Sequence, residues 1–263
     1  MPEAVPSSDL RRVVRVGREA GAVHAAVATC ELAADGSVGA HLHSFEELVY
    51  VLAGTPRLDL DEGSFELGPG QAAWIGPGEA HAWSNPGGDE VGWIELHAPP
   101  PRAAGAPVDT IAVSGFAAVG AAEPLDPTDP RRRRFGRWRA GGADGPIEAL
   151  PGITATPVID TRQGAAQAKT FVVEFSPGTA LPAHDHPFEE TFYVLEGEIA
   201  FSADGVERLL TPGDVGSAPV GGIHAFENRS GAPCLWLESQ SPLPPARGNT
   251  RVQGPWSRLA ERG

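Results

Sequence analysis

The stretch HLHSFEELVYVLAG, residues 41–54, places two histidines one residue apart, then a glutamate, then an apolar run that ends at glycine. A related stretch, AHDHPFEETFYVLEG, occupies residues 183–197. Residues two apart on a strand point to the same face, so both histidines of each pair project to one side. A single half-buried histidine on a strand would not by itself indicate a function. The recurrence of the whole pattern does.

The two stretches belong to a longer internal repeat with a constant shift of 143 residues and no insertion or deletion. The shift also aligns WIELHAP at 93–99 with WLESQSP at 236–242. Each copy spans about seventy residues, which is too long for a solenoid unit and suits a small β domain. The matched positions include His41 with His184, His43 with His186, Glu47 with Glu190, His81 with His224, and Asn85 with Asn228. The chain is therefore predicted to contain a duplicated domain.

Each copy has the pattern of strands joined by short turns, which predicts an all-β fold. Residues 47–54 and 190–197 are rich in β-branched and aromatic residues. LDLDEGSFEL at 58–67 and AFSADGVERLL at 200–210 are typical of hairpins with an acidic residue and glycine in the turn. The 33 glycines and 26 prolines of the chain also favour many short strands over long helices.

The histidines and glutamates of the repeat are candidate metal ligands. A histidine pair on one strand face, a glutamate after the next turn and a later histidine would bring three imidazoles and one carboxylate together inside a barrel. These donors suit a first-row divalent metal. The eight candidates are His41, His43, Glu47, His81, His184, His186, Glu190 and His224. An octahedral metal with four protein ligands keeps two open positions, which a catalytic site needs and a closed structural site lacks.

The same residues resemble the motifs of the cupin superfamily. In the second copy, the first cupin motif is matched by Gly178, His184, His186, Glu190 and Gly197, and the second by Gly213, Pro219, Gly221, His224 and Asn228. The first copy departs twice from the motifs. Asp35 stands where a glycine is expected, and Gly76 stands where a proline is expected. Both are turn positions, so they bear on local geometry more than on metal binding.

The resemblance implies a bicupin, with two tandem antiparallel jelly-roll barrels that each hold a metal. We expect an N-terminal barrel at 1–115, a connector at 116–150 and a C-terminal barrel at 151–263. We favour the second copy as the main catalytic site because its turns match the family motifs in full. The superfamily includes enzymes of many kinds as well as regulators and storage proteins, so it implies no single reaction.

Strand alternation selects further candidates for the two sites. Residues on the same strand face as the glutamates would line a substrate pocket, although ordinary core packing explains them as well. These residues are Val49, Val51, Phe192 and Val194. Glu95 and Glu238 recur in apolar strands and are candidate catalytic acid–base groups, partners of a ligand histidine, or solvent-facing side chains. His97 in one copy is Gln240 in the other, so we expect the two sites to differ in role.

Charge and composition limit the partners. A net charge of −14 argues against nonspecific binding to nucleic acid or an anionic membrane, which leaves small molecules. No stretch approaches the ~20 apolar residues of a membrane span, and we expect a cytoplasmic protein. Cys30 and Cys234 are too few for a disulfide framework and are interpreted as reduced, buried thiols. Apolar residues on both faces of the central strands also leave room for a homo-oligomer.

An arginine-rich stretch, RRRRFGRWR at 131–139, stands out from this acidic background. We interpret it mainly as a solvated connector that pairs with acidic surface. The alternative is a clamp for an anionic substrate.

The metal site favours an enzyme that acts on a small organic substrate, with aromatic compounds suited to its apolar surround. The leading hypothesis is a dioxygenase-type oxidoreductase with Fe(II) or Mn(II), and with dioxygen as second substrate. The metals Ni, Cu and Zn remain open. The alternative is a non-oxidative isomerase, decarboxylase, cyclase or aminohydrolase. A metal-containing binding or storage protein is the third class, and two complete open sites argue against storage.

Overall fold

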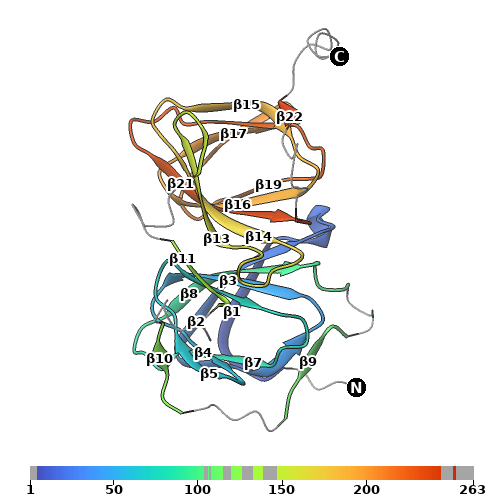
Figure 1. Cartoon of the computed structure of the whole chain (residues 1–263), viewed down its shortest axis with the longest axis vertical. Helices are drawn as coiled ribbons and strands as arrows, with labels where there is room; N and C mark the ends of the chain where they lie inside the picture. Colours follow the sequence, from blue (N-terminus) through green and yellow to red (C-terminus); the bar gives the residue numbers. More distant parts are fainter. Residues whose placement is uncertain are drawn as a thin grey trace. The chain divides into compact units, whose positions relative to one another are not determined.

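The computed structural model confirms an almost entirely β architecture. It describes residues 5–103, 106, 108–114, 120–125, 133–138, 147–243 and 251–252. The single helical element among them is the short 3-10 turn η1, Arg18–Ala20. The chain divides into two compact units, the described parts of 1–143 with 157–170 and of 144–156 with 171–263 (Figure 1). The three domain ranges expected from the sequence remain predictions.

The first unit is built on one sheet that curls into a barrel. Strand order along the sheet is β10-β5-β4-β7-β2-β8-β3-β6-β11, with β1 and β9 paired to β2. The strands are β1 Ser7–Val16, β2 Ala26–His43, β3 Glu46–Ala53, β4 Arg57–Leu60, β5 Gly63–Glu66, β6 Gln71–Ile75, β7 His81–Ser84, β8 Val91–Ala98, β9 Thr110–Ala112, β10 Glu123–Pro124 and β11 Phe135–Arg137. All of the pairings are antiparallel except the short β10–β5 pair.

Strand β2 organises this barrel because it is 18 residues long and pairs along its length with four other strands. Its first half pairs with β1 and β8, and its last residues pair with β7 and β9. Cys30 lies opposite Arg12 of β1 in the first half, while His41 lies opposite His81 of β7 near the end. One strand therefore connects the histidine pair to the residues around Cys30.

The second unit is a barrel of two sheets. One sheet has the order β12-β13-β14-β21-β16-β19 and the other β18-β17-β20-β15-β22. The strands are β12 Ile147–Leu150, β13 Ile153–Ile159, β14 Lys169–Phe175, β15 Ala180–Asp185, β16 Glu189–Glu196, β17 Ile199–Ala203, β18 Val206–Leu210, β19 Val215–Ala218, β20 His224–Glu227, β21 Cys234–Ser241 and β22 Arg251–Val252.

The predicted hairpins are confirmed in both units. Strands β4 and β5 pair with Leu60 opposite Gly63, and strands β17 and β18 pair with Ala203 opposite Val206. The second turn has Asp204 and Gly205 at φ of 52° and 76°. Two successive residues with positive φ are characteristic of the tight hairpin turn that matches strand twist.

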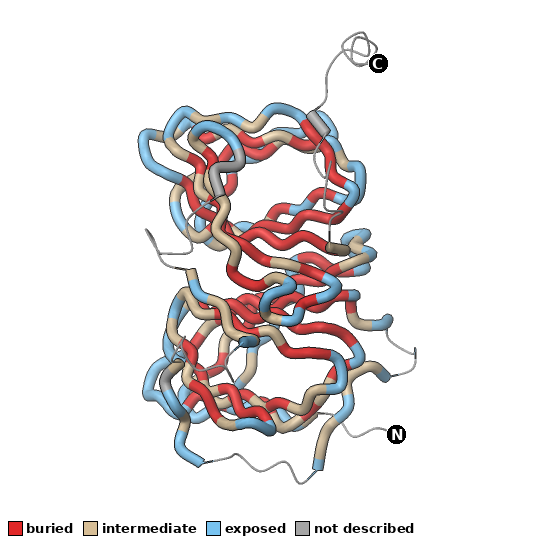
Figure 2. Tube along the Cα trace, viewed as in Figure 1, coloured by how far each residue is buried: buried red, intermediate tan, exposed pale blue. Residues whose placement is uncertain are grey.

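Each unit has its own apolar core between the curled strands, and the buried stretches follow the strands (Figure 2). Trp83 and Trp93 stack in the first core with ring centroids 5.4 Å apart. Phe192 lies in the second core at 5.0 Å from Phe226 and 5.7 Å from Trp236. Aromatic packing of this kind adds to the free energy of burial.

The two cores differ at one packing position. Phe192 lies opposite Gly216 in the β16–β19 pair, whereas Val49 lies opposite Ala73 at the matching place in the β3–β6 pair. A Cβ added at Gly216 would lie 2.1 Å from the Phe192 ring. The larger side chain in the second barrel therefore fills the space that the missing Cβ leaves.

Part of the arginine-rich stretch is described, from Arg133 to Trp138. Arg134 pairs there with the acidic residues Glu62 and Glu79, as the connector interpretation expects, but its side chain is only 13% exposed and so is not solvated. Arg131, Arg132 and Arg139 lie outside the described residues, as do residues 116–119, 126–132 and 139–146 of the expected connector.

Candidate metal centres

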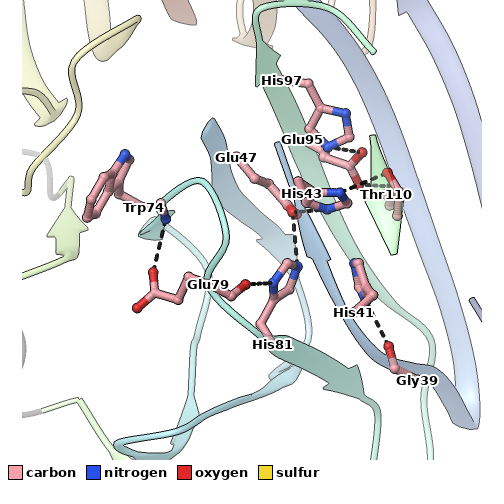
Figure 3. Close-up of polar contacts among 12 residues, drawn as sticks. Gly39, His41, His43, Glu47, Trp74, Glu79, His81, Glu95, His97 and Thr110 are labelled. Carbon is pink, nitrogen blue, oxygen red and sulfur yellow. Dashed lines mark hydrogen bonds and ion pairs between the residues drawn. The ribbon is translucent and has the colours of Figure 1, made fainter. Parts of the chain in front are cut away.

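The first barrel brings its four candidate ligands together (Figure 3). His41 and His43 come from the end of β2, Glu47 from β3 and His81 from the start of β7. Glu47 Oε2 lies 3.0 Å from His43 Nε2 and 3.1 Å from His81 Nε2. The ligand atoms of all four residues lie within 4.8 Å of one another. The geometry is that of donors directed at one point.

The other ring nitrogen of each histidine is occupied, which leaves Nε2 for the interior of the cluster. Nδ1 of His41 lies 2.7 Å from the carbonyl of Gly39, and Nδ1 of His81 lies 3.1 Å from that of Glu79. A carbonyl only accepts, so each Nδ1 carries the proton and each Nε2 keeps its lone pair. His43 Nδ1 lies 3.0 Å from Thr110 Oγ1. Such contacts fix a ligand ring's orientation.

The first cluster fits a divalent cation because it is buried and its inner atoms are unsatisfied. Glu47 Oε2 and His81 Nε2 are buried and make no aligned hydrogen bond. Burial lowers the pKa of His41 to about 4, so this ring is neutral. Burial would raise the pKa of Glu47, but His81 and His43 hold it well below its usual range. A neutral His41 and an ionised Glu47 are in the protonation states that a metal requires. Burial would lower the pKa of His81, but Glu47 raises it, so a bound metal would displace a proton from this ring.

The second barrel repeats the arrangement. The ligand atoms of His184, His186 and His224 lie within 4.8 Å of one another. Glu190 Oε2 lies 3.1 Å from His186 Nε2, and Oε1 lies 3.7 Å from His224 Nε2. Glu190 Oε1 and His224 Nε2 are buried without an aligned hydrogen bond, so this cluster fits a cation too. Nδ1 of His184 donates to the carbonyl of Pro182 at 2.8 Å, and Nδ1 of His224 donates to that of Gly222 at 2.9 Å.

A cavity of about 290 Å³ opens onto the first cluster. Its walls include three ligands, His41, His43 and Glu47. The remaining walls are largely apolar, with Phe45, Trp83 and Trp93 among them, and one polar wall contains Arg12, Glu95 and His97. A cavity of this size and lining suits a small organic molecule that has one or two polar groups.

Glu95 is the centre of the polar wall. Its Oε1 accepts from Arg12 Nε at 2.7 Å and lies 2.7 Å from both Arg12 Nη2 and His97 Nε2. Its Oε2 accepts from the Cys30 thiol at 3.2 Å. Burial would raise the pKa of Glu95, but His97 and Arg12 lower it to about 2. Burial raises the pKa of the Cys30 thiol above its usual value, so it stays protonated.

Glu47, Glu95 and His97 also lie close enough together to suggest a further cation site. The guanidinium of Arg12 already lies against Glu95 Oε1, the oxygen nearest His97. A second cation there would face strong repulsion. We therefore interpret this group as a wall of the cavity and not as a separate metal centre.

A family model for the cupin domain matches residues 28–97 and again residues 171–239. The chain belongs to the cupin family. With two matched regions and two barrels, it is a bicupin, as the sequence motifs predicted.

Known structures confirm this bicupin fold. A single-residue variant of oxalate decarboxylase from Bacillus subtilis has a TM-score of 0.68 at 16% identity, over 98% of this chain and 81% of that one. Salicylate 1,2-dioxygenase from Pseudaminobacter salicylatoxidans has a TM-score of 0.70 at 14% identity, over 89% of this chain and 76% of that one. The tetracenomycin polyketide synthase protein TcmJ of Streptomyces glaucescens is 28% identical over 101 residues, which are 38% of this chain and 68% of that protein.

The bicupin's two barrels differ around the second glutamate. Glu238, the counterpart of Glu95, accepts from Trp236 Nε1 at 3.1 Å and from Gln240 Nε2 at 2.9 Å. At the shift of 143 residues, Ala155, Val173 and Gln240 stand where the first barrel has Arg12, Cys30 and His97. These two donors to Glu238 are neutral, whereas the donors to Glu95 include a cation.

The apolar pocket candidates lie in the barrel cores. Val49 and Val51 pack in the first core and are not among the residues that line the 290 Å³ cavity. Phe192 and Val194 pack in the second core. The alternative interpretation, core packing, accounts for these positions, and contact with a substrate stays a prediction.

Sequence reasoning did not select Arg12 or Cys30 as site residues. Cys30 was interpreted only as a buried thiol, and Arg12 lies before the matched repeat. The pairing of Arg12 with Cys30 on neighbouring strands is what brings both to Glu95. No helix among the described residues is long and apolar enough to cross a membrane.

Proposed function

We propose that this bicupin is a metal-dependent dioxygenase-type enzyme that acts on a small anionic, aromatic substrate in its first barrel. The observation that carries the proposal is the cavity, where a four-ligand cluster faces an arginine across apolar walls. His41, His43, Glu47 and His81 would hold the metal there, and His184, His186, Glu190 and His224 would hold one in the second barrel. The metal, Fe(II) or Mn(II) in our proposal, would supply Lewis acidity and redox chemistry at its open positions.

Arg12 supports the anionic character of the substrate. The Arg12 side chain is 31% exposed, whereas the Glu95 side chain is only 9% exposed. The buried Glu95 carboxylate therefore holds a guanidinium that lines the cavity. Its Nη1 group takes no part in the contacts with Glu95 and His97. A guanidinium with free N–H donors binds a carboxylate or phenolate oxygen well. The names of two structural neighbours, salicylate dioxygenase and oxalate decarboxylase, also contain acids of this kind.

The apolar walls support an aromatic substrate, since Phe45, Trp83 and Trp93 would cover a flat ring and exclude water around it. Glu95 is ionised and faces the same cavity, where it holds the Arg12 guanidinium. Its pKa of about 2 makes it a weak base, so we propose it as a proton acceptor only for a substrate that displaces Arg12 or His97 from it. Glu238, held by two neutral donors in the second barrel, is proposed for a lesser role there.

The first barrel is preferred as the catalytic one, which revises the preference for the second copy drawn from its motifs. Of the two motif departures, Gly76 lies at a turn as expected, but Asp35 lies within strand β2, with a φ of 59°. Neither lines the cavity, whereas the differences at Arg12, Cys30 and His97 lie on or against its wall. Paired variants test this choice: His41→Ala should abolish turnover, and His184→Ala should retain it. The opposite result would assign catalysis to the second barrel.

A non-oxidative reaction is the second candidate. Glu95 beside the metal cluster would serve a decarboxylase, isomerase or cyclase equally well, because such reactions need a Lewis acid and a proton acceptor but no oxidant. The likeness to oxalate decarboxylase favours keeping this class. An aminohydrolase has no comparable support.

Oxygen uptake separates the two candidates. Protein reconstituted anaerobically with Fe(II) or Mn(II) would be assayed with salicylate, gentisate and oxalate, with an oxygen electrode and product analysis in parallel. The dioxygenase proposal requires stoichiometric oxygen uptake and loss of turnover under nitrogen. Turnover at an unchanged rate under nitrogen would instead establish the non-oxidative class.

A further inference from the structure

The turn that leads to the last ligand histidine differs between the barrels. In the second barrel it begins at Pro219, whose ring restricts the backbone, and Gly222 N donates to the Pro219 carbonyl at 2.8 Å. In the first barrel Gly76 stands in place of that proline. A glycine there costs backbone entropy on folding, so the first turn relies on other constraints, of which the next residue, Pro77, is one.

Glu79 supplies one such constraint. Its side-chain Oε2 accepts from Gly76 N at 3.0 Å, the N–H group that a proline would lack. Its backbone nitrogen also lies 3.2 Å from the Gly76 carbonyl. The Glu79 carboxylate therefore holds the turn by a hydrogen bond to its first residue. The second barrel has Gly222 at the position of Glu79, so it has no side chain there.

Arg134 of the arginine-rich stretch holds this carboxylate. Arg134 Nη1 donates to Glu79 Oε2 at 2.5 Å, and its Nε donates to Glu62 Oε1 at 2.8 Å. The Arg134 side chain is only 13% exposed, so water screens these pairs less than a surface pair. An arginine between two carboxylates in this setting is a fixed clamp and not a loose surface contact.

The clamp is anchored to the barrel by its own backbone. Trp74 N donates to the Arg134 carbonyl at 2.9 Å, and the next residue, Phe135, pairs with Ala73 across β11 and β6. The Phe135 ring packs on Phe65 at 5.0 Å between centroids. The guanidinium is therefore presented to Glu79 from the residue directly before β11, in the same unit.

Glu79 is connected directly to the metal cluster through its main chain. Its carbonyl accepts from His81 Nδ1 at 3.1 Å, which orients the ligand ring (Figure 3). In the same turn, Gly78 N donates to the His43 carbonyl at 2.7 Å. A displacement of the turn would thus move one ligand and the support of another.

We infer that Arg134, acting through Glu79, is a positioning residue that sets how tightly the first barrel holds its metal. The inference rests on the proposed function in that it assumes a metal at the first cluster. The Arg134–Glu79 pair does in the first barrel what Pro219 does in the second. Outer partners of metal ligands typically change affinity by about 10–100-fold when removed, and we expect about 10-fold faster metal release from Arg134→Met.

The experiment follows metal release from the full chain, loaded with two metals, after addition of a chelator. Arg134→Met and Glu79→Gln should each accelerate release of one metal per chain about 10-fold and leave the other unchanged. The double variant should be no faster than either single variant, because both act through one contact. Arg134→Lys should restore part of the slow release.

Arg229→Met is the matched control, since Arg229 also lies between two carboxylates, Glu207 and Glu227, in the second barrel. It should leave both release rates as they are. Amide hydrogen exchange at Gly76 and Gly78 gives a readout that needs no metal, and both amides should exchange faster in Arg134→Met.

Unchanged release and unchanged exchange in Arg134→Met, with two metals still bound, would overturn the inference and leave the proposed function standing. Acceleration at both sites, or equal acceleration by Arg229→Met, would also overturn it, because the effect would then be general destabilisation. A wild-type chain that binds no metal in the first barrel would overturn both proposals. Two tightly held metals without turnover of any acid tested would count against the function alone.

Discussion

Replacing Arg12 by methionine should destabilise the first barrel strongly. Arg12 contacts Glu95 Oε1 through both Nε and Nη2 at 2.7 Å, and the Glu95 side chain is 9% exposed. Removing one partner of a buried ion pair leaves an uncompensated charge, at a cost of about 3–5 kcal/mol. Because Arg12 is 31% exposed, we expect the lower limit, about 3 kcal/mol. For a domain of this size, that free energy lowers the midpoint of thermal unfolding by about 6–12 °C.

The assay is calorimetry of the full chain at fixed metal loading, which keeps the contribution of metal binding constant. Arg11→Met is the matched control on the same strand. Arg11 pairs with Glu31, and their side chains are 68% and 36% exposed. A pair this exposed contributes at most about 1 kcal/mol. Arg12→Met should therefore lower the midpoint of thermal unfolding at least twice as far as Arg11→Met.

The double variant Arg12→Met with Glu95→Gln separates charge from packing. It removes the uncompensated charge, so its unfolding midpoint should lie above that of Arg12→Met alone. Substrate binding should not recover, because the anion-binding group is still missing. If the two single arginine variants unfold at the same temperature, the argument that the pair is buried and charge-dependent is refuted.

Three further outcomes are expected. His43→Ala and His186→Ala should each lower the metal content from about two to about one per chain, as measured by mass spectrometry; an unchanged content would reject that ligand. Gly216→Ala should lower the free energy of unfolding by about 1–3 kcal/mol, because its Cβ would approach the Phe192 ring to 2.1 Å. Adding Phe192→Val should recover most of this free energy, as measured by denaturant titration. No recovery would contradict the packing account. Asn85→Ala should cost about 1–3 kcal/mol, because it removes the amide donor that lies 2.8–3.1 Å from the carbonyls of Leu32, Ala33 and Asp89, of which the Leu32 contact is buried. A loss below about 1 kcal/mol would contradict this.

Much of the fold was predictable because the repeat encodes it locally. The HxH pairs, the glycine turns and the acidic hairpin turn at Asp204 are short-range patterns whose geometry depends on neighbours in sequence. The convergence of His81 on the histidine pair was predictable too, since the motif fixes the spacing between the strands that carry them.

The polar wall was not predictable, because it depends on register between distant strands. Arg12 reaches Glu95 only because β1 pairs with β2 so that Arg12 lies opposite Cys30, and the composition of β1 does not specify that register. The fit of Phe192 to Gly216 was missed for a similar reason. Alternation places a side chain on a face, but the space it meets is set by the partner strand.

The position of Arg12 outside the matched repeat has an evolutionary consequence. The candidate metal ligands of the first barrel lie within residues 28–97, whereas the guanidinium proposed to select the substrate comes from β1, before that segment. Mutations in β1 can therefore alter which molecules are accepted without touching a ligand. Substrate preference can therefore change through this one strand while the candidate metal ligands stay the same.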